Sequence, residues 1–166
     1  MNALPEADQI GIVFPVYIWG LPLIVSRFIK KLSRRNEGTY IFAIATNGGA
    51  VSGASLLAKK KISMMGLKLS AGFSVSLPSN FVSVHQTSQE EQQRLFVAAA
   101  RKLEEILSII KSEKTYPVEK GTMIERILKT GVAYHIFSFI IPKMDHDFWT
   151  NQNCNGCGLC SNAMPA

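Results

Sequence analysis

Three cysteines near the C-terminus are the residues whose spacing most directly indicates chemistry. Cys154, Cys157 and Cys160 follow the pattern C-x2-C-x2-C, and the chain has no other cysteine. This pattern is typical of bacterial iron–sulfur sites, where three thiolates surround one face of a cluster. Such a run continues with three residues, a fourth cysteine and a proline. Here Met164 stands at the fourth position and Pro165 follows it.

The incomplete ligand set leaves three outcomes open for this tail. The three thiolates could hold a three-iron cluster, or a labile four-iron cluster whose fourth ligand is exogenous. They could also hold zinc with His146 as a fourth ligand, since zinc accepts thiolates and imidazole together. The tail could otherwise bind no metal and remain an oxidisable run of thiols. A thioether is a weak ligand beside a thiolate, so Met164 is not counted as a replacement.

A second chemical feature is an aromatic loop behind the first apolar run of the chain. Residues 14–22 read Phe-Pro-Val-Tyr-Ile-Trp-Gly-Leu-Pro. Pro15 ends a predicted strand, so Tyr17 and Trp19 would lie at its carboxyl end. Open parallel sheets bind ligands at this end. The two aromatic side chains could receive a flat ring, or they could simply cover a hydrophobic edge.

A third feature is a glycine-containing segment behind the second apolar run. Thr46-Asn47-Gly48-Gly49 occupies another loop at a predicted carboxyl end. Glycine allows a backbone to approach a ligand closely, because no Cβ intervenes. The segment matches neither the P-loop nor G-x-G-x-x-G, so it does not indicate a phosphate site by itself. No Ser/His/Asp or Cys/His arrangement stands out, and no catalytic residue is predicted.

Alternating strand and helix patterns must position these loops. Apolar runs predict strands over residues 9–14, 39–45 and 67–77, and the first run, which lacks clean alternation, indicates burial on both faces. Three strand–helix units of this kind predict an α/β fold with a parallel sheet and right-handed crossovers.

Helix-period patterns predict helices over residues 21–35 and 53–65, and a long one that begins after Ser88 and stops before Tyr116. Ser52 is the expected N-cap of the second helix. Capping boxes are expected at Ser88 with Glu91 and at Thr122 with Glu125. The second box opens a further apolar helix that leads towards the cysteines.

Composition and charge narrow the class of protein. The chain has 166 residues, 47% of them hydrophobic, and a formal net charge of +6. No apolar run is long enough to span a membrane, and no signal peptide is recognisable at the N-terminus, so a cytoplasmic protein is expected. Aromatic residues are not interleaved with the basic ones, which argues against nucleic-acid binding. The basic clusters, Lys30-Lys31 with Arg34-Arg35 and Lys59-Lys60-Lys61, are read as solvated helix ends or as a docking surface for an acidic partner.

Together these motifs resemble a bacterial and archaeal family that joins a short flavodoxin-like domain to a ferredoxin domain. The resemblance is carried by residues 14–22, by residues 45–49, and by Cys154 to Cys160 with Pro165, and it covers roughly residues 9–166. It implies a partial flavodoxin-like three-layer parallel sheet with a C-terminal helix and the start of a ferredoxin domain. The implied divisions are a flavodoxin-like domain over 1–112, a linker with an apolar helix over 113–148, and a truncated cluster motif over 149–166.

The resemblance also implies cofactors, site residues and a function. FMN would have Pro15, Tyr17, Trp19 and Gly20 on one side of its ring and Thr46, Asn47, Gly48 and Gly49 on the other. A 4Fe–4S cluster would be bound by Cys154, Cys157 and Cys160. Electrons would pass between FMN and the iron–sulfur cluster, and the implied partner is a redox protein. Acid–base groups are not required for this function, so enzyme activity is left open.

The chain departs from this family at its N-terminus. Flavodoxin-like proteins begin with a strand and a T-x-T-G-N-T loop, which holds the phosphate of FMN at a helix N-terminus. Only eight residues precede the first predicted strand here. The missing strand would be the central one, so the sheet would keep an exposed apolar edge that invites association. As an alternative, the chain could therefore be a cofactor-free remnant without redox activity, or a module that binds a partner protein through this edge or through its basic face. A third hypothesis is a small zinc-binding module.

Overall fold

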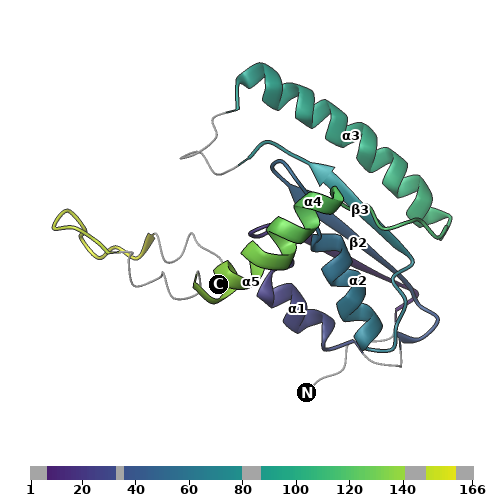
Figure 1. The fold of residues 1–166 in the computed structure, drawn as a ribbon. Helices are drawn as coiled ribbons and strands as arrows, with labels where there is room; N and C mark the ends of the chain where they lie inside the picture. The colour runs from purple at the N-terminus through teal and green to yellow at the C-terminus, as the bar shows by residue number, and fades with distance from the viewer. Residues whose placement is uncertain (1–6, 33–35, 80–86, 141–148, 160–166) are drawn as a thin grey trace.

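The computed structural model describes residues 7–32, 36–79, 87–140 and 149–159, and it contains a parallel three-stranded sheet (Figure 1). The strands β1 (Gln9–Pro15), β2 (Tyr40–Asn47) and β3 (Ala71–Ser76) are adjacent in this order. Gln9 lies opposite Tyr40 and Phe42 lies opposite Ala71. The predicted α/β class with a parallel sheet is confirmed. All three strands point their carboxyl ends to the same side.

Helices cover the two faces of this sheet unequally. The helices α1 (Leu23–Ile29) and α2 (Ala54–Met64) lie on one face, and α3 (Gln89–Lys111) lies on the other (Figure 1). The first face encloses the larger core, built from β1, β2, α1 and α2. The second core joins β2 and β3 to α3, with Phe73 fully buried between them. None of the helices in the described ranges is long and apolar enough to cross a membrane.

The C-terminal helical segment runs past the carboxyl ends of the strands (Figure 1). It consists of α4 (Met123–Glu125), the π-helix η2 (Arg126–Ala133) and α5 (Tyr134–Ile140). The predicted capping box is present at its start, where Thr122 Oγ1 accepts the Glu125 N–H and the Glu125 carboxylate accepts the Thr122 N–H. π-Helices are rare and occur mostly as single-turn bulges within α-helices, frequently at functional sites.

The predicted N-cap of α2 is wrong, whereas the predicted N-cap residue of α3 is confirmed. Ser52 does not cap α2, because its φ is +45° and its hydroxyl is buried; Gly53 is the N-cap, without a side-chain hydrogen bond. At α3 half of the expected capping box is present, since Ser88 Oγ accepts the Glu91 N–H at 3.2 Å. The first helix is shorter than predicted, and Pro22 is its N-cap rather than part of its first turn.

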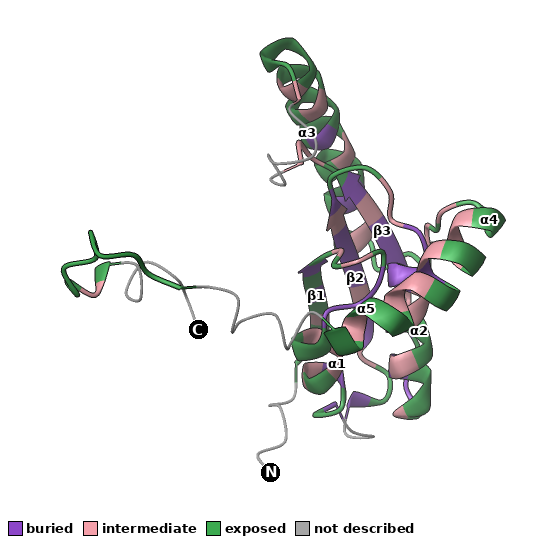
Figure 2. Ribbon diagram, turned by 60° about the vertical axis from the view of Figure 1, so that its left-hand side comes forward, coloured by how far each residue is buried: buried purple, intermediate pink, exposed green. Residues whose placement is uncertain are grey.

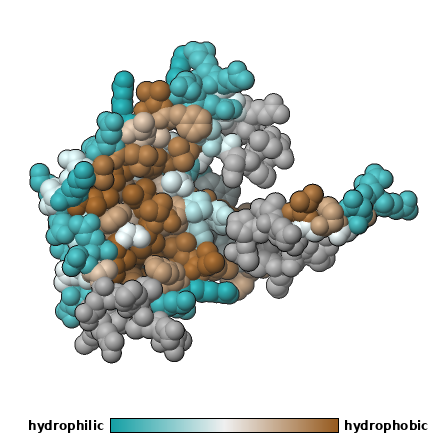
Figure 3. All heavy atoms as spheres, turned by 180° about the vertical axis from the view of Figure 1, so that it is seen from behind, coloured by the Kyte–Doolittle hydropathy of each residue, from teal (hydrophilic) through white to brown (hydrophobic). Residues whose placement is uncertain are grey.

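The prediction that the first strand is buried on both faces is wrong. Ile12 and Phe14 are 4% and 1% exposed, whereas Val13 between them is 64% exposed. The physical reason is that α3 packs against β3 and, within the described residues, no helix lies over β1 on that face. The Phe42 ring lies over Gly11, where a Cβ would come within 2.5 Å of it. Figure 3 shows apolar side chains gathered on this side of the molecule; we call the surface of Val13 and Phe42 the bare face.

The two edges of the sheet also differ. The edge of β3 is covered by the segment after α3, where Tyr116 N–H donates to Ser70 O and Glu119 N–H donates to Gly72 O, at 3.0 and 2.9 Å. The Tyr116 ring stacks on Phe73 with a centroid separation of 5.1 Å. The predicted linker therefore closes one edge. On its outer edge, β1 has no neighbouring strand among the described residues.

Candidate functional site

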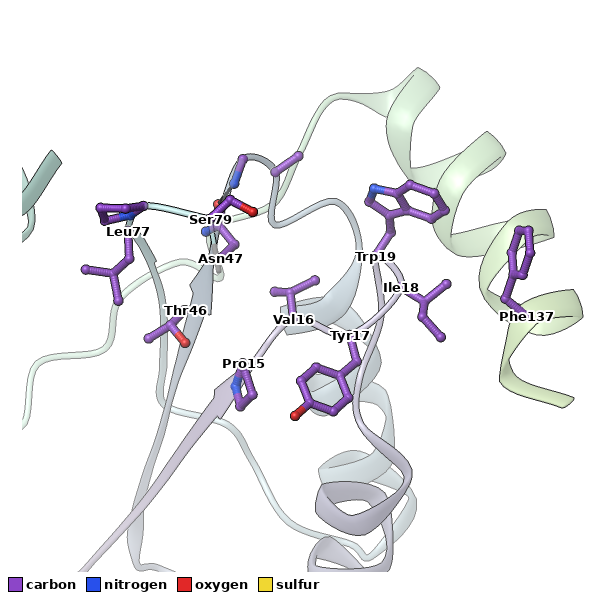
Figure 4. A pocket seen from close by; sticks show the side chains of 14 residues that line it. Pro15, Val16, Tyr17, Ile18, Trp19, Thr46, Asn47, Leu77, Ser79 and Phe137 are labelled. Carbon is purple, nitrogen blue, oxygen red and sulfur yellow. Dashed lines mark hydrogen bonds between the residues drawn. The ribbon is translucent and has the colours of Figure 1, made fainter. Parts of the chain in front are cut away.

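A cavity of about 750 Å³ lies at the carboxyl ends of the strands (Figure 4). Each strand contributes its carboxyl end or the loop that follows it, and α5 contributes one aromatic side chain. The lining residues are Pro15, Val16, Tyr17, Ile18 and Trp19 from the end of β1 and its loop, Thr46, Asn47, Gly48, Gly49 and Ala50 from the end of β2 and its loop, Leu77, Pro78 and Ser79 after β3, and Phe137 of α5. We call this cavity the loop pocket. None of these residues carries a charged side chain.

The loop pocket brings together most of the site residues expected from the sequence. Pro15, Tyr17 and Trp19 line it on one side, and the segment from Thr46 to Gly49 lines it on another. Gly20 is not a lining residue, because it is buried beneath the ring of Tyr134. That these residues hold a cofactor stays a prediction.

The aromatic loop is a strained two-residue turn. Tyr17 and Gly20 exchange backbone hydrogen bonds of 3.2 and 2.9 Å, and the residues between them, Ile18 and Trp19, have φ values of +49° and +58°. Such a turn favours Asn-Gly, and a β-branched residue at positive φ is a genuine outlier. The cost is on the order of 1–3 kcal/mol for each residue. Strain of this kind is often found at ligand sites; here it holds Tyr17 and Trp19 at the pocket rim, 59% and 37% exposed.

The two glycines behind β2 have different surroundings. A Cβ on Gly48 would come within 2.9 Å of Ser79 Cα, so Gly48 allows the second and third loops to pack together. A Cβ on Gly49 would meet nothing within 4 Å. The buried Asn47 side chain ties Gly49 to β3, since its amide donates to Ser74 Oγ at 2.9 Å and its carbonyl oxygen accepts the Gly49 N–H at 3.2 Å. Gly49 is therefore the glycine where a ligand could approach the backbone.

Thr130 of η2 connects the aromatic loop to the start of α2. Its hydroxyl accepts the Gly53 N–H at 2.8 Å and donates to the Trp19 carbonyl at 2.7 Å. The side chain is 7% exposed, so these bonds are shielded from water. Gly53 permits the close approach, because a Cβ there would lie 2.8 Å from Thr130 Cγ2.

Tyr134 provides the second attachment of the C-terminal helices. Its hydroxyl donates to the Leu21 carbonyl at 2.7 Å, and burial raises the pKa of this phenol, which therefore stays protonated as the donor. Gly20 accommodates the ring, since a Cβ there would come within 2.2 Å of it. Sequence reasoning missed Thr130, Tyr134 and Phe137, and it did not assign Leu77, Pro78 and Ser79 to the site. The residues bonded to Thr130 and Tyr134 lie 77 to 113 positions away in the sequence, and no local pattern marks these two side chains.

Part of the cysteine motif lies within the described residues. Cys154 and Cys157 are free and exposed, as is most of the segment around them (Figure 2). Gly156 and Gly158 flank Cys157 with φ values of +69° and +73°, and Asn155 Oδ1 accepts the Cys157 N–H at 3.1 Å. Cys160, His146 and Met164, whose possible roles as ligands were considered from the sequence, lie outside the described residues. Within the described ranges, no three His, Cys, Asp or Glu side chains are grouped so that they could hold a metal.

The loop pocket fits one part of FMN better than another. Its aromatic and aliphatic walls, with backbone exposed at Gly49, suit a flat uncharged ring system. Its described lining offers no cation for a phosphate.

Comparison with models of known protein families gives no match, and comparison with curated proteins gives none either.

The two hydrogen bonds of Thr130 lead to a stability prediction. Thr130→Val keeps the side-chain shape but leaves the Gly53 N–H and the Trp19 carbonyl unpaired in a buried setting. We expect the free energy of unfolding to fall by about 1–3 kcal/mol, because an unsatisfied buried polar group has a cost of that size. Urea denaturation measures this change.

Two control variants accompany Thr130→Val. Thr130→Ser retains the hydroxyl and should lose less stability. Thr150→Val applies the same chemical change at an exposed position and should alter stability by no more than about 0.5 kcal/mol. If Thr130→Val and Thr150→Val had equal effects, the bridging role of Thr130 would be refuted.

Proposed function

We propose that this chain is an electron-transfer protein that passes electrons between a flavin and an iron–sulfur cluster. The flavin is FMN by resemblance, and its ring lies in the loop pocket. One observation carries the proposal: Tyr17 and Trp19 of the first loop and Gly49 of the second, which the sequence motifs assign to a flavin ring, line a single cavity. Phe137 adds a further aromatic wall to that cavity.

The pocket residues would bind the ring by stacking and by excluding water. Tyr17, Trp19 and Phe137 supply aromatic faces, and the strained turn keeps the first two at the rim without the need to order a mobile loop on binding. A bound flavin would supply the redox chemistry, and the protein would tune it through burial and hydrogen bonding. The apolar lining lowers the local polarity around the ring.

The cysteine tail supports the second half of the proposal. Cys154 and Cys157 are exposed and free to act as thiolate ligands, and Cys160 completes the C-x2-C-x2-C motif. The proposed cluster is of the 4Fe–4S type by resemblance. The cytoplasm suits such thiols, because they remain reduced there. An acidic redox partner would dock on the basic side chains, of which Lys59 and Lys60 are exposed.

A flavin titration tests the pocket. Purified protein is titrated into FMN, and the flavin fluorescence is followed. Trp19→Ala should weaken binding by about tenfold, since it removes a stacking face worth roughly 1.4 kcal/mol. Trp149→Ala is the matched control, because Trp149 is 80% exposed in the tail, and it should bind FMN as the parent protein does. If FMN did not bind, or if both variants weakened binding equally, the flavin half of the proposal would fail.

An anaerobic reconstitution tests the cysteine motif. The protein is incubated with ferrous iron and sulfide, and the visible spectrum and the iron, sulfide and zinc contents are measured. We expect iron and sulfide in the ratio of a cluster, and we expect Cys157→Ser to lose most of both. Stoichiometric zinc without sulfide would contradict the cluster and favour the zinc module.

The bare face supports a second candidate function. Val13 is 64% exposed on a strand whose outer edge has no neighbour among the described residues. An open parallel edge beside exposed apolar side chains is a surface on which another chain could add a strand. A folded protein that binds neither flavin nor iron but associates through this surface would favour a partner-binding module.

A further inference from the structure

We infer that the loop pocket recognises the flavin ring alone, so that the phosphate of FMN adds nothing to the affinity. The ligand class is then a neutral planar heteroaromatic ring, and unphosphorylated flavins belong to it. This inference rests on the proposed flavin site and deepens it. Three features of the described residues support it: the lining of the pocket, the position of the basic side chains, and the state of the helix N-termini.

The described lining provides no positively charged partner for a phosphate dianion. Its side chains with polar atoms are those of Tyr17, Trp19, Thr46, Asn47 and Ser79, and none of the described lining residues is Lys, Arg or His. The Asn47 amide already donates to Ser74 Oγ, and its oxygen already accepts the Gly49 N–H. Phosphate sites in proteins are built from cations or from several free N–H donors, such as those at a helix N-terminus. A ring needs only flat apolar faces and a few backbone groups.

The described lysines of the two basic clusters lie away from the pocket. Because α1 and α2 connect parallel strands, each runs from the carboxyl end of the sheet back towards its amino end (Figure 1). Lys30 and Lys31 follow the last residue of α1, and Lys59 to Lys61 run from the middle of α2 towards its end. Their ammonium groups therefore belong to the opposite side of the molecule from the loop pocket.

Two cations of η2 lie closer to the carboxyl ends but do not line the pocket. Lys129 Nζ is paired with the Glu125 carboxylate at 2.9 Å. Arg126 borders a separate hollow together with Met123, Ile127 and Gly131. Neither side chain lines the loop pocket, so neither is positioned to contact a phosphate attached to a ring bound there.

The long helices of the described chain do not offer an anion-binding N-terminus. At α2 the Gly53 N–H is taken by Thr130 Oγ1, and the first residues, Ala54 and Ser55, are 0% and 1% exposed. At α3 the first turn carries Glu90 and Glu91, whose carboxylates repel an anion. The helix-end mechanism that holds phosphates in other nucleotide sites is therefore not available at these positions.

The test compares three ligands that share one ring. Lumiflavin, riboflavin and FMN are titrated against the full chain, at low and at high salt, and their dissociation constants are compared. We expect the three constants to agree within about threefold, which is less than 1 kcal/mol. The FMN constant should also be insensitive to salt, because none of the described lining residues carries a positive charge. Inorganic phosphate should not compete with riboflavin.

A variant of Arg126 adds a second readout. Arg126→Gln should leave the ratio of the FMN and riboflavin constants unchanged. Tighter binding of FMN by tenfold or more, or a ratio that changes in Arg126→Gln, would overturn the inference while leaving the flavin site itself intact. Failure of all three ligands to bind would instead refute the proposed flavin site, and with it the inference.

Discussion

The Thr130 hydroxyl is the contact on which the candidate site depends. It joins three segments far apart in the sequence: the π-helix η2, the aromatic loop at Trp19 and the start of α2 at Gly53. Without it, the C-terminal helices would be attached near the pocket mainly by Tyr134. The two glycines at positions 20 and 53 make both attachments possible, because a Cβ at either position would collide with the helical side chains. Gly20, which the sequence motif assigns to a ligand site, is thus required for the packing of Tyr134.

The pocket is arranged by strain on one side and by hydrogen bonds on the other. Ile18 and Trp19 occupy left-handed conformations that an Asn-Gly pair would adopt more readily. Asn47 fixes the opposite loop through Ser74 and Gly49. Both loops are therefore held in place before a ligand arrives. A preformed apolar pocket of this kind gains affinity for a rigid ring, because little conformational entropy remains to be lost.

Much of the fold could be predicted from the sequence, because strand–helix alternation and capping patterns are local. The parallel sheet and the caps at Ser88 and Thr122 followed from such patterns. The exposed side of β1 could not be foreseen, since Val13 looks like a core residue until the packing of α3 is known. The first two pocket loops were predicted from their strand ends and residue types, whereas the third, Leu77 to Ser79, was not assigned to the site. Thr130, Tyr134 and Phe137 were missed because tertiary packing alone brings them to the site.

One measurement tests the central claim that the loop pocket is the ring-binding site. Amide chemical shifts of the isotope-labelled chain are recorded as riboflavin is added. The account predicts that the perturbed amides belong to residues 17–20 and 46–50 and to Phe137. Perturbation centred on the bare face at Val13 and Phe42, with the loop pocket unchanged, would contradict it.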